Sequence, residues 1–301
     1  MGSDVAVVMA RGGGRVTLVD SDPARSVAAA ERVRGLLALD RAASAEIDAV
    51  RTLGQVGWSD VDLVVENVPE QLAFKQKVFA DLDRLAPPDA LLTSNSSGIP
   101  IREIGAGLAG VRRMFGLHFF MPAHLVPLVE VVMGPSSDVN AAQRLVAWMR
   151  ALGSVPVLVR RDLPGFLANR LQHALSREAF ALIDDGIASP EDVDAAVRYG
   201  FGFRFLAAGP VLQRDHGGVD IHCAAAATIY PSLSNTTQPS RTLREAVDAG
   251  RFGLKVGRGF YDWPEPQRTA ENERYARMLR EGLKLLAGDM KSCSQDGSTG
   301  R

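Results

Sequence analysis

The first half of the chain alternates short apolar runs with longer amphipathic stretches. The apolar runs are rich in β-branched residues and predict strands at 15–20, 62–67, 90–95, 113–120, 127–133 and 155–160. The stretches around them have apolar residues at helical spacing and predict helices at 3–11, 23–50, 69–86 and 138–152. Because strands that alternate with helices form parallel sheets, the pattern predicts an α/β fold with a doubly wound, mostly parallel sheet.

The pattern changes after "DLPGF" at 162–166, and no clear strand follows. Amphipathic stretches take over, and they predict helices at 166–185, 190–199, 217–230, 240–249 and 268–287. The final segment, 291–301, is small and polar, which is typical of a disordered tail. We therefore predict an α/β domain at 1–162, an all-helical domain at 163–290 and a tail at 291–301.

Composition excludes several classes of protein. The 301 residues are 46% hydrophobic, which suffices for two domains, and the net charge of −1 indicates neither nucleic-acid nor membrane-surface binding. The two cysteines, Cys223 and Cys293, are too far apart for a zinc cluster, and no metal site is predicted. We find no apolar run of membrane-spanning length and no signal peptide, so we expect a cytoplasmic protein.

Asp20 ends the strand predicted at 15–20, "RVTLVD". In a dinucleotide-binding fold, an acid at this place accepts hydrogen bonds from the adenosine ribose and repels a 2′-phosphate. Asp20 therefore favours NAD over NADP, although nearby Arg25 weakens that inference. The alternative is that Asp20 is only a turn residue that opens "DSDP".

Two further segments follow predicted strands, where open α/β sheets bind ligands. "SNSSGIPI" at 94–101 offers Ser and Asn side chains that could contact a nicotinamide or a substrate oxygen, but simple turn chemistry is an alternative. "ENVPEQLAFK" at 66–75 places Glu66 and Glu70 near the same edge. Glu70 could equally be an acid favoured by the dipole at the start of a helix.

The segment "GLHFFMPAHLVPLVEV" is the most informative. His118 lies in one apolar strand and Glu130 in the next, and buried polar residues in such places are rare unless they are paired. A carboxylate that holds one imidazole nitrogen leaves the other free as a base, as alcohol oxidation requires. The alternative is a structural pair. We expect His124, in the connecting loop, to be exposed.

Together these segments resemble the 3-hydroxyacyl-CoA dehydrogenase family. The resemblance covers nearly the whole chain, through "RVTLVD", "DLVVENVPE", "SNSSGIPI", "GLHFF-P", "PLVEV", "PGFLANR", "GIASPEDVDAAVRYGFG", "GPVLQRDHGGVD" and "GRFGLKVGRGFYDW". It implies an NAD-binding Rossmann-like domain followed by a helical domain that forms a homodimer. It also implies that the protein oxidises a 3-hydroxyacyl-CoA, or catalyses the reverse reaction.

The resemblance also implies roles for individual residues. His118 is the general base, Glu130 orients it, and Ser97 and Asn169 bind the reacting oxygen. The cofactor site is implied at six positions, namely Gly2, Asp20, Glu70, Lys75, Asn95 and Ser97.

Some positions differ from the family pattern. Met121 stands where the family usually has Asn, and 35–66 contains no lysine, although the fatty-acid members carry a lysine-rich helical hairpin there that holds CoA. Two alternatives therefore stay open: a dehydrogenase of a free hydroxy acid or hydroxymethyl carboxylate, and a catalytically silent member. Gly2 aligns with the third glycine of the dinucleotide loop, so the first strand is absent and we expect the sheet to be divided.

Overall fold

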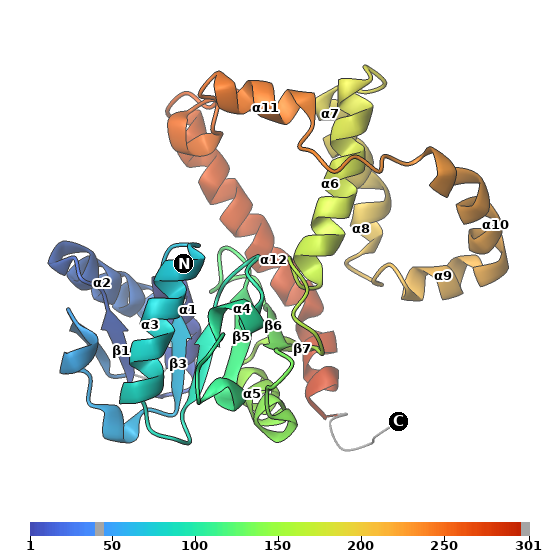
Figure 1. Ribbon diagram of the computed structural model, residues 1–301. Coiled ribbons are helices and arrows are strands. Elements are labelled where there is room, and N and C mark those ends of the chain that lie inside the picture. Colours follow the sequence, from blue (N-terminus) through green and yellow to red (C-terminus); the bar gives the residue numbers. More distant parts are fainter. Residues whose placement is uncertain (40–44, 296–301) are drawn as a thin grey trace. The chain divides into compact units, whose positions relative to one another are not determined.

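The computed structural model describes residues 1–39 and 45–295 and divides into two units, Met1–Arg170 and Leu171–Arg301 (Figure 1). The division falls eight residues after the boundary that the sequence pattern suggests, because the first turn of helix α6 (Ala168–Asp184) is bonded to the first unit. The backbone amide of Ala168 donates to Glu130, and the side chain of Asn169 donates to Ser97.

The described strands of the first unit form two separate sheets, as expected. Strands β1 (Val16–Val19) and β2 (Ile47–Val50) form a parallel pair. The second sheet has five strands in sequential order: β3 (Leu63–Glu66), β4 (Leu91–Ser94), β5 (Met114–Phe119), β6 (Leu128–Met133) and β7 (Val155–Val159). Within this sheet only β5 and β6 are antiparallel, so the prediction of a mostly parallel sheet is confirmed.

The prediction of one helix over 23–50 was wrong at its end. Helix α2 ends at Leu39, and residues 47–50 form β2, which pairs with β1. The Ala-rich composition of this stretch favours a helix, but pairing with a neighbouring strand overrides so weak a preference. Residues 40–44, which the predicted helix includes, lie outside the described part of the chain.

The described residues of the first unit form five α-helices: α1 (Gly2–Arg11), α2 (Pro23–Leu39), α3 (Leu72–Leu85), α4 (Ile101–Ile104) and α5 (Val139–Ala151). Helix α1 packs against both sheets. Val5 and Val8 enter a core with residues of β4, β5 and β6, whereas Ala6, Val7 and Ala10 enter a second core with α2 and β2. Each face of this short helix therefore carries a different core.

After α6, the second unit as far as Gln295 contains six α-helices: α7 (Pro190–Ala195), α8 (Gly202–Arg204), α9 (Leu212–Gly217), α10 (Val219–Ile229), α11 (Arg241–Asp248) and α12 (Gln267–Gln295). A π-helical segment, Ala196–Phe201, continues α7. The described residues of this unit contain isolated β-bridges but no strand, which agrees with the helical domain that we expected. None of the described helices is long and apolar enough to cross a membrane.

Helix α12 continues to Gln295, five residues into the segment that we expected to be a tail. Extending an existing helix fixes one residue for each hydrogen bond gained, so polar residues of moderate helix propensity can continue it. The rest of the predicted tail, 296–301, lies outside the described residues.

Candidate active site

His118 and Glu130 face each other across the antiparallel pair of strands β5 and β6. The His118 Nδ1 atom lies 2.7 Å from Glu130 Oε2, and both side chains are buried. Strand pairing alone places them together, because directly opposite residues of antiparallel strands project from the same face of the sheet. The sequence reasoning anticipated this contact from two polar residues in apolar strands.

Glu130 is held in its ionised form. Burial by itself raises the pKa of Glu130, but hydrogen bonds from His118 and from the amides of Ala168 and Leu167 outweigh burial and lower that pKa below its ordinary value. An ionised carboxylate only accepts hydrogen bonds, so His118 Nδ1 must carry a hydrogen and donate it. In the neutral ring, Nε2 is therefore left as the acceptor.

The amide donors to Glu130 come from the start of helix α6. Leu167 N and Ala168 N lie 2.9 and 2.8 Å from Glu130 Oε1. The N-terminus of a helix favours an anion, because its first amides have no partner within the helix and the dipole is positive there. The chain reaches this position through Gly165 and Phe166, which have φ values of 74° and 49°. A positive φ is unusual for a phenylalanine and is strained.

Ser97 lies on the other side of the imidazole. The Ser97 hydroxyl is 3.2 Å from His118 Nε2, and Asn169 Nδ2 donates to the Ser97 carbonyl at 3.1 Å. The rings of Phe120 and Phe166 pack edge-on against the imidazole, with centroids 4.6 and 5.6 Å from it. The four residues for which we predict catalytic roles therefore form one connected group at the carboxyl ends of β4 and β5.

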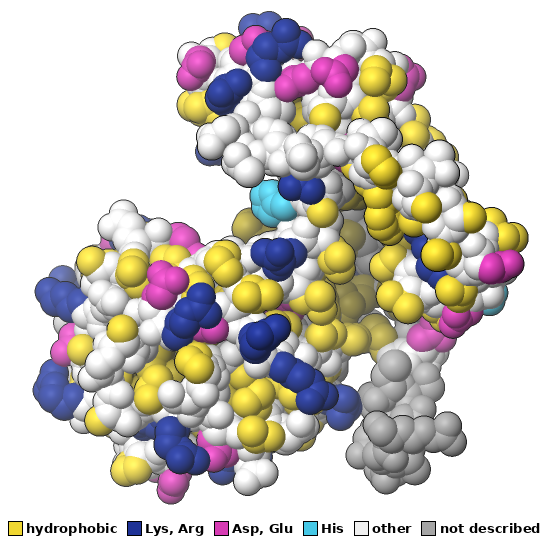
Figure 2. All heavy atoms as spheres, turned by 45° about the vertical axis from the view of Figure 1, so that its right-hand side comes forward, with side chains coloured by type: hydrophobic (Ala, Val, Ile, Leu, Met, Phe, Trp, Pro, Cys, Tyr) yellow, Lys and Arg dark blue, Asp and Glu magenta, His cyan; other side chains and the backbone are white. Residues whose placement is uncertain are grey.

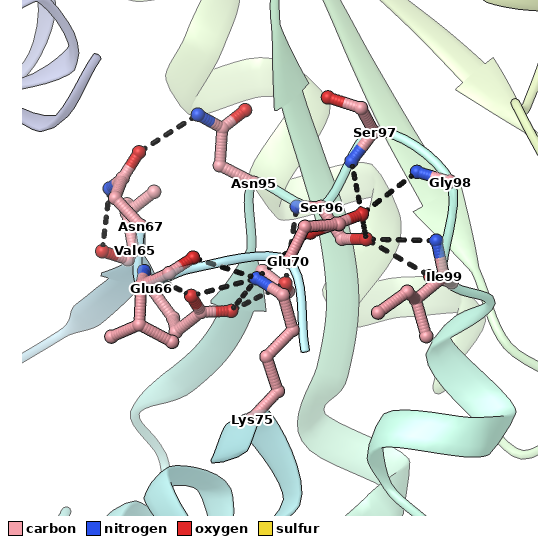
Figure 3. Close-up of polar contacts among 12 residues, drawn as sticks. Val65, Glu66, Asn67, Glu70, Lys75, Asn95, Ser96, Ser97, Gly98 and Ile99 are labelled. Carbon is pink, nitrogen blue, oxygen red and sulfur yellow. Dashed lines mark hydrogen bonds and ion pairs between the residues drawn. The ribbon is translucent and has the colours of Figure 1, made fainter. Parts of the chain in front are cut away.

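Glu70 and Lys75, two of the positions implied for the cofactor, belong to a polar network beneath the same edge (Figure 3). Glu70 Oε1 accepts from the backbone amides of Ser97 and Gly98, each at 3.1 Å. Burial raises the pKa of Glu70, but the Ser96 hydroxyl, the Lys75 charge and the Gly98 amide lower it overall. Glu70 thus fixes the loop that carries Ser97.

Lys75 is fully buried, and its Nζ lies 2.9 Å from Glu66 Oε1 and 3.3 Å from Glu70 Oε2. The Ser94 hydroxyl donates to the second oxygen of Glu66 at 2.7 Å. Lys75 therefore acts on this edge through the two carboxylates that it binds. Glu66 is a positioning residue that is missing from our predicted site residues. The available signal was an acid at the end of an apolar strand with a lysine nine residues later.

Asn95 joins the ends of three strands. Its Oδ1 accepts from the Phe119 amide at 2.8 Å, and its Nδ2 donates to Asn67 Oδ1 at 2.8 Å. The loops that follow β3 and β4 are therefore tied together beside β5 (Figure 3). Asn67 is a second residue that sequence reasoning did not select.

Asp20 and Gly2 belong to the other half of the unit. Asp20 follows β1, and its half-exposed carboxylate accepts from the Asp22 amide at 2.9 Å and lies 3.5 Å from Arg25. Its remaining acceptor capacity suits ribose hydroxyls. Gly2 begins α1, where a Cβ would lie an ordinary 3.7 Å from Asn67. No close contact requires glycine there; the position offers the start of a ten-residue helix, which suits a pyrophosphate.

The loop between β5 and β6 contradicts the expectation that His124 is exposed. His124 is mostly buried rather than exposed, and it packs against α1. Its Nδ1 lies 3.4 Å from the buried Asp4, and Arg11 donates to its carbonyl at 3.0 Å. Burial, together with the charges of Arg32 and Arg11, outweighs Asp4 and lowers the pKa of His124. Met121 in the same loop is exposed.

A Rossmann-like sheet with a buried histidine–carboxylate pair at its ligand edge is the arrangement of a nicotinamide-dependent dehydrogenase. The protein-family model described as the 3-hydroxyacyl-CoA dehydrogenase NAD binding domain matches residues 1–163, and the family model of the C-terminal domain matches residues 165–263. The chain therefore belongs to the 3-hydroxyacyl-CoA dehydrogenase family, and its cofactor is NAD.

Two relatives differ in their substrates. A 5-formyl-3-hydroxy-2-methylpyridine 4-carboxylate 5-dehydrogenase of Mesorhizobium japonicum is 33% identical over 299 residues, which cover 96% of both chains. A crystal structure of an enzyme of that name, described as an NAD⁺-dependent dismutase, matches with a TM-score of 0.88 at 33% identity and covers 96% of both chains. A 3-hydroxybutyryl-CoA dehydrogenase of Mycobacterium tuberculosis is 36% identical over 276 residues, 87% of this chain and 95% of the relative.

Proposed function

We propose that this protein oxidises a hydroxyl-bearing carbon of a small molecule with NAD, and that His118 is the general base. The observation that carries the proposal is the placement of the imidazole between a buried, ionised Glu130 and the exposed loop of Ser97. This placement fixes the tautomer and leaves Nε2 available for a substrate proton.

Each residue has a distinct part in this reaction. His118 Nε2 takes the hydroxyl proton, and Glu130 stabilises the imidazolium that results. The Ser97 hydroxyl and Asn169 hold the reacting oxygen, since Asn169 already lies 3.1 Å from the Ser97 carbonyl. NAD, when bound, supplies the hydride acceptor. Positioned proton transfer of this kind contributes roughly 10²–10⁴-fold to a rate.

The cofactor-binding residues have separate tasks. Asp20 would accept from the adenosine ribose, and the start of α1 at Gly2 would face the pyrophosphate. Glu70 and Asn95 would border the nicotinamide, and Lys75 would hold Glu70 in place from below. The contacts of Glu70 with the Ser97 and Gly98 amides support this division of roles, because they couple the cofactor edge to the catalytic loop.

For the substrate, we propose a free hydroxy acid or hydroxymethyl carboxylate. The support is the similarity to the pyridine-carboxylate dehydrogenase over 96% of both chains, together with the lack of lysine at 35–66. A 3-hydroxyacyl-CoA is the second candidate, supported by the family and by the M. tuberculosis relative.

The two candidates are separated by turnover measurements on the whole protein. NAD reduction is followed with a panel of hydroxymethyl pyridine and benzene carboxylates and with 3-hydroxybutyryl-CoA, each compared with a His118→Ala variant. We expect His118-dependent turnover of a free acid and little turnover of the thioester. Turnover of the thioester alone would support the second candidate. No turnover of either, with NAD bound, would support a catalytically silent protein.

We further propose that two copies of the chain associate through their helical units. Several large apolar side chains of this unit are exposed, including Tyr199, Phe203, Val211, Ile221, Tyr230 and Leu285. Figure 2 shows hydrophobic side chains across much of the surface of the helical unit. Large exposed apolar patches are typical of surfaces that bind another protein. Light scattering should give twice the mass of the chain, and the mass of a single chain would contradict the proposal.

A further inference from the structure

A cavity of about 380 Å³ lies among the helices α8, α9 and α10 of the second unit. Its chemically active lining residues are Arg204, Gln213, Arg214, His216 and His222. The volume falls within the range of small-molecule sites, which begins at about 300 Å³. Every one of these residues belongs to the second unit, whereas the residues proposed for catalysis belong to the first.

The residues that line this cavity include basic side chains but no acid. Two arginines and two histidines line it, and none of its lining residues is a carboxylate. Neither Arg204 nor Arg214 forms an ion pair among the residues that the structure describes, although Arg274 of the same unit pairs with Glu271 at 2.6 Å. Two guanidinium groups that line one cavity without an acid form a site of positive potential that attracts anions.

Arg214 is held in place by a neighbouring ring. The shorter of its two contacts with His222 joins Nη1 to Nδ1 at 2.9 Å. Arginine keeps its protons and can only donate, so Nδ1 accepts and the hydrogen of the neutral His222 ring lies on Nε2. His222 thus holds Arg214, whose other N–H groups stay available as donors.

The turn between α9 and α10 brings Arg214 and His222 together. Gly218 lies between the two helices with a φ of 90°, a backbone conformation that favours glycine. A Cβ on Gly217 would lie 2.6 Å from His222 Nε2, so the glycine lets the ring lie against the backbone. Gln213 donates to the carbonyl of Ala208 at 3.1 Å and so ties α9 to the chain that follows α8. The arrangement is therefore built by local backbone features.

We propose that this cavity binds an oxyanion, either a carboxylate or a phosphate group, between Arg204 and Arg214. Guanidinium groups bind both kinds of oxyanion through paired, charge-assisted hydrogen bonds. The site would hold an anionic ligand or the anionic end of one independently of hydride transfer. If the cavity binds no oxyanion, the proposed dehydrogenase reaction is therefore unaffected.

The test is calorimetric titration of the whole protein without NAD, using three probes in turn: pyridine-4-carboxylate, inorganic phosphate and adenosine 3′,5′-bisphosphate. We expect saturable binding of at least one probe. Arg204→Gln and Arg214→Gln should each weaken it about ten-fold or more, because each removes a hydrogen bond to a charged group. The control is Arg280→Gln, which removes an exposed arginine of α12 outside the cavity and should leave binding unchanged.

The three probes distinguish the source of the anion. Only binding that Arg204→Gln and Arg214→Gln weaken is assigned to the cavity, because the dehydrogenase site can also bind a pyridine carboxylate or an adenosine nucleotide. Such binding of pyridine-4-carboxylate identifies a carboxylate ligand, that of phosphate a free phosphate, and that of the bisphosphate alone a nucleotide. Arg214→Lys, which keeps the charge, should retain part of the affinity, and thermal unfolding checks that each variant is folded. Absence of binding for all three probes, or equal binding by the cavity variants and Arg280→Gln, would overturn the proposal.

Discussion

Replacing Glu130 by glutamine tests the proposed mechanism most directly. Glu130 Oε2 accepts from His118, while Oε1 accepts from the amides of Leu167 and Ala168. Glutamine keeps the shape of this side chain but has one acceptor oxygen and one donor NH₂ group. Only one of the two sides can therefore keep its acceptor.

The two orientations of the new amide differ in their consequences. If its oxygen faces His118, its NH₂ group points at two backbone donors, and leaving buried groups unsatisfied costs about 1–3 kcal/mol each. If its oxygen faces the helix amides, its NH₂ group points at His118 Nδ1, which must then accept. The second orientation satisfies every group, so we expect it to prevail with a small loss of stability. It moves the ring hydrogen to Nε2 and removes the base.

We therefore expect Glu130→Gln to lower kcat by about 10²–10⁴-fold, the range for general-base catalysis, with NAD affinity unchanged. The melting temperature should fall by only a few degrees, since about 1 kcal/mol shifts it by roughly 2–4 °C in a domain of this size. The measurements are steady-state NAD reduction, NAD titration and thermal unfolding. The matched control, Glu103→Gln, changes an exposed acid of α4 and should leave all three unchanged. Wild-type kcat in Glu130→Gln would refute the mechanism.

The remaining predictions concern acid stability, the buried lysine and the catalytic loop. Because the folded-state pKa of Glu130 is lowered, its contribution to stability is present above the ordinary pKa of 4.5 and is lost as pH falls through the lowered value. Acid titration followed by circular dichroism should therefore show a smaller loss of folded protein below pH 4.5 in Glu130→Gln than in the wild type. Identical curves would contradict this. Lys75→Met leaves Glu66 buried and unpaired and should lower the free energy of unfolding in urea by about 3–5 kcal/mol. The double variant Lys75→Met/Glu66→Gln should recover part of this loss. A loss below about 1 kcal/mol would show that water replaces the ammonium group. Ser97→Ala removes a hydroxyl beside His118 and should lower kcat about 10²–10³-fold without changing the melting temperature. A change in stability alone would assign Ser97 a structural role.

The catalytic pair was predictable because its signal is local and physical. A histidine and a glutamate inside apolar strands are costly unless they meet, and strand pairing makes them meet. Ser97 was predictable for a related reason, since it lies in a loop beyond the end of a parallel strand. Apart from β2 and the short helix α4, the order of strands and helices in the first unit followed from periodicity.

Other features depend on contacts that sequence patterns do not contain. The positive φ of Phe166, which directs two amides at Glu130, is set by the surrounding tertiary structure. The burial of His124 depends on Asp4, 120 residues earlier, and β2 depends on pairing with β1. The sequence pattern around Lys75 is that of a surface helix residue, but in the structure its ammonium group is buried between two acids, Glu66 and Glu70. In each case a distant partner overrides the local preference.

The position of α1 between two cores has a consequence for cooperativity. The pair β1–β2 shares no ladder with β3–β7, and the two cores meet through the opposite faces of α1. Side-chain packing is thus the main tie between them, and such a tie permits sub-global opening, in which one part unfolds while the other stays intact. Amide hydrogen exchange should therefore separate two populations in this unit, with β1 and β2 exchanging faster than β4 and β5. Ligand binding at Asp20 would then stabilise this half more than the half that carries His118.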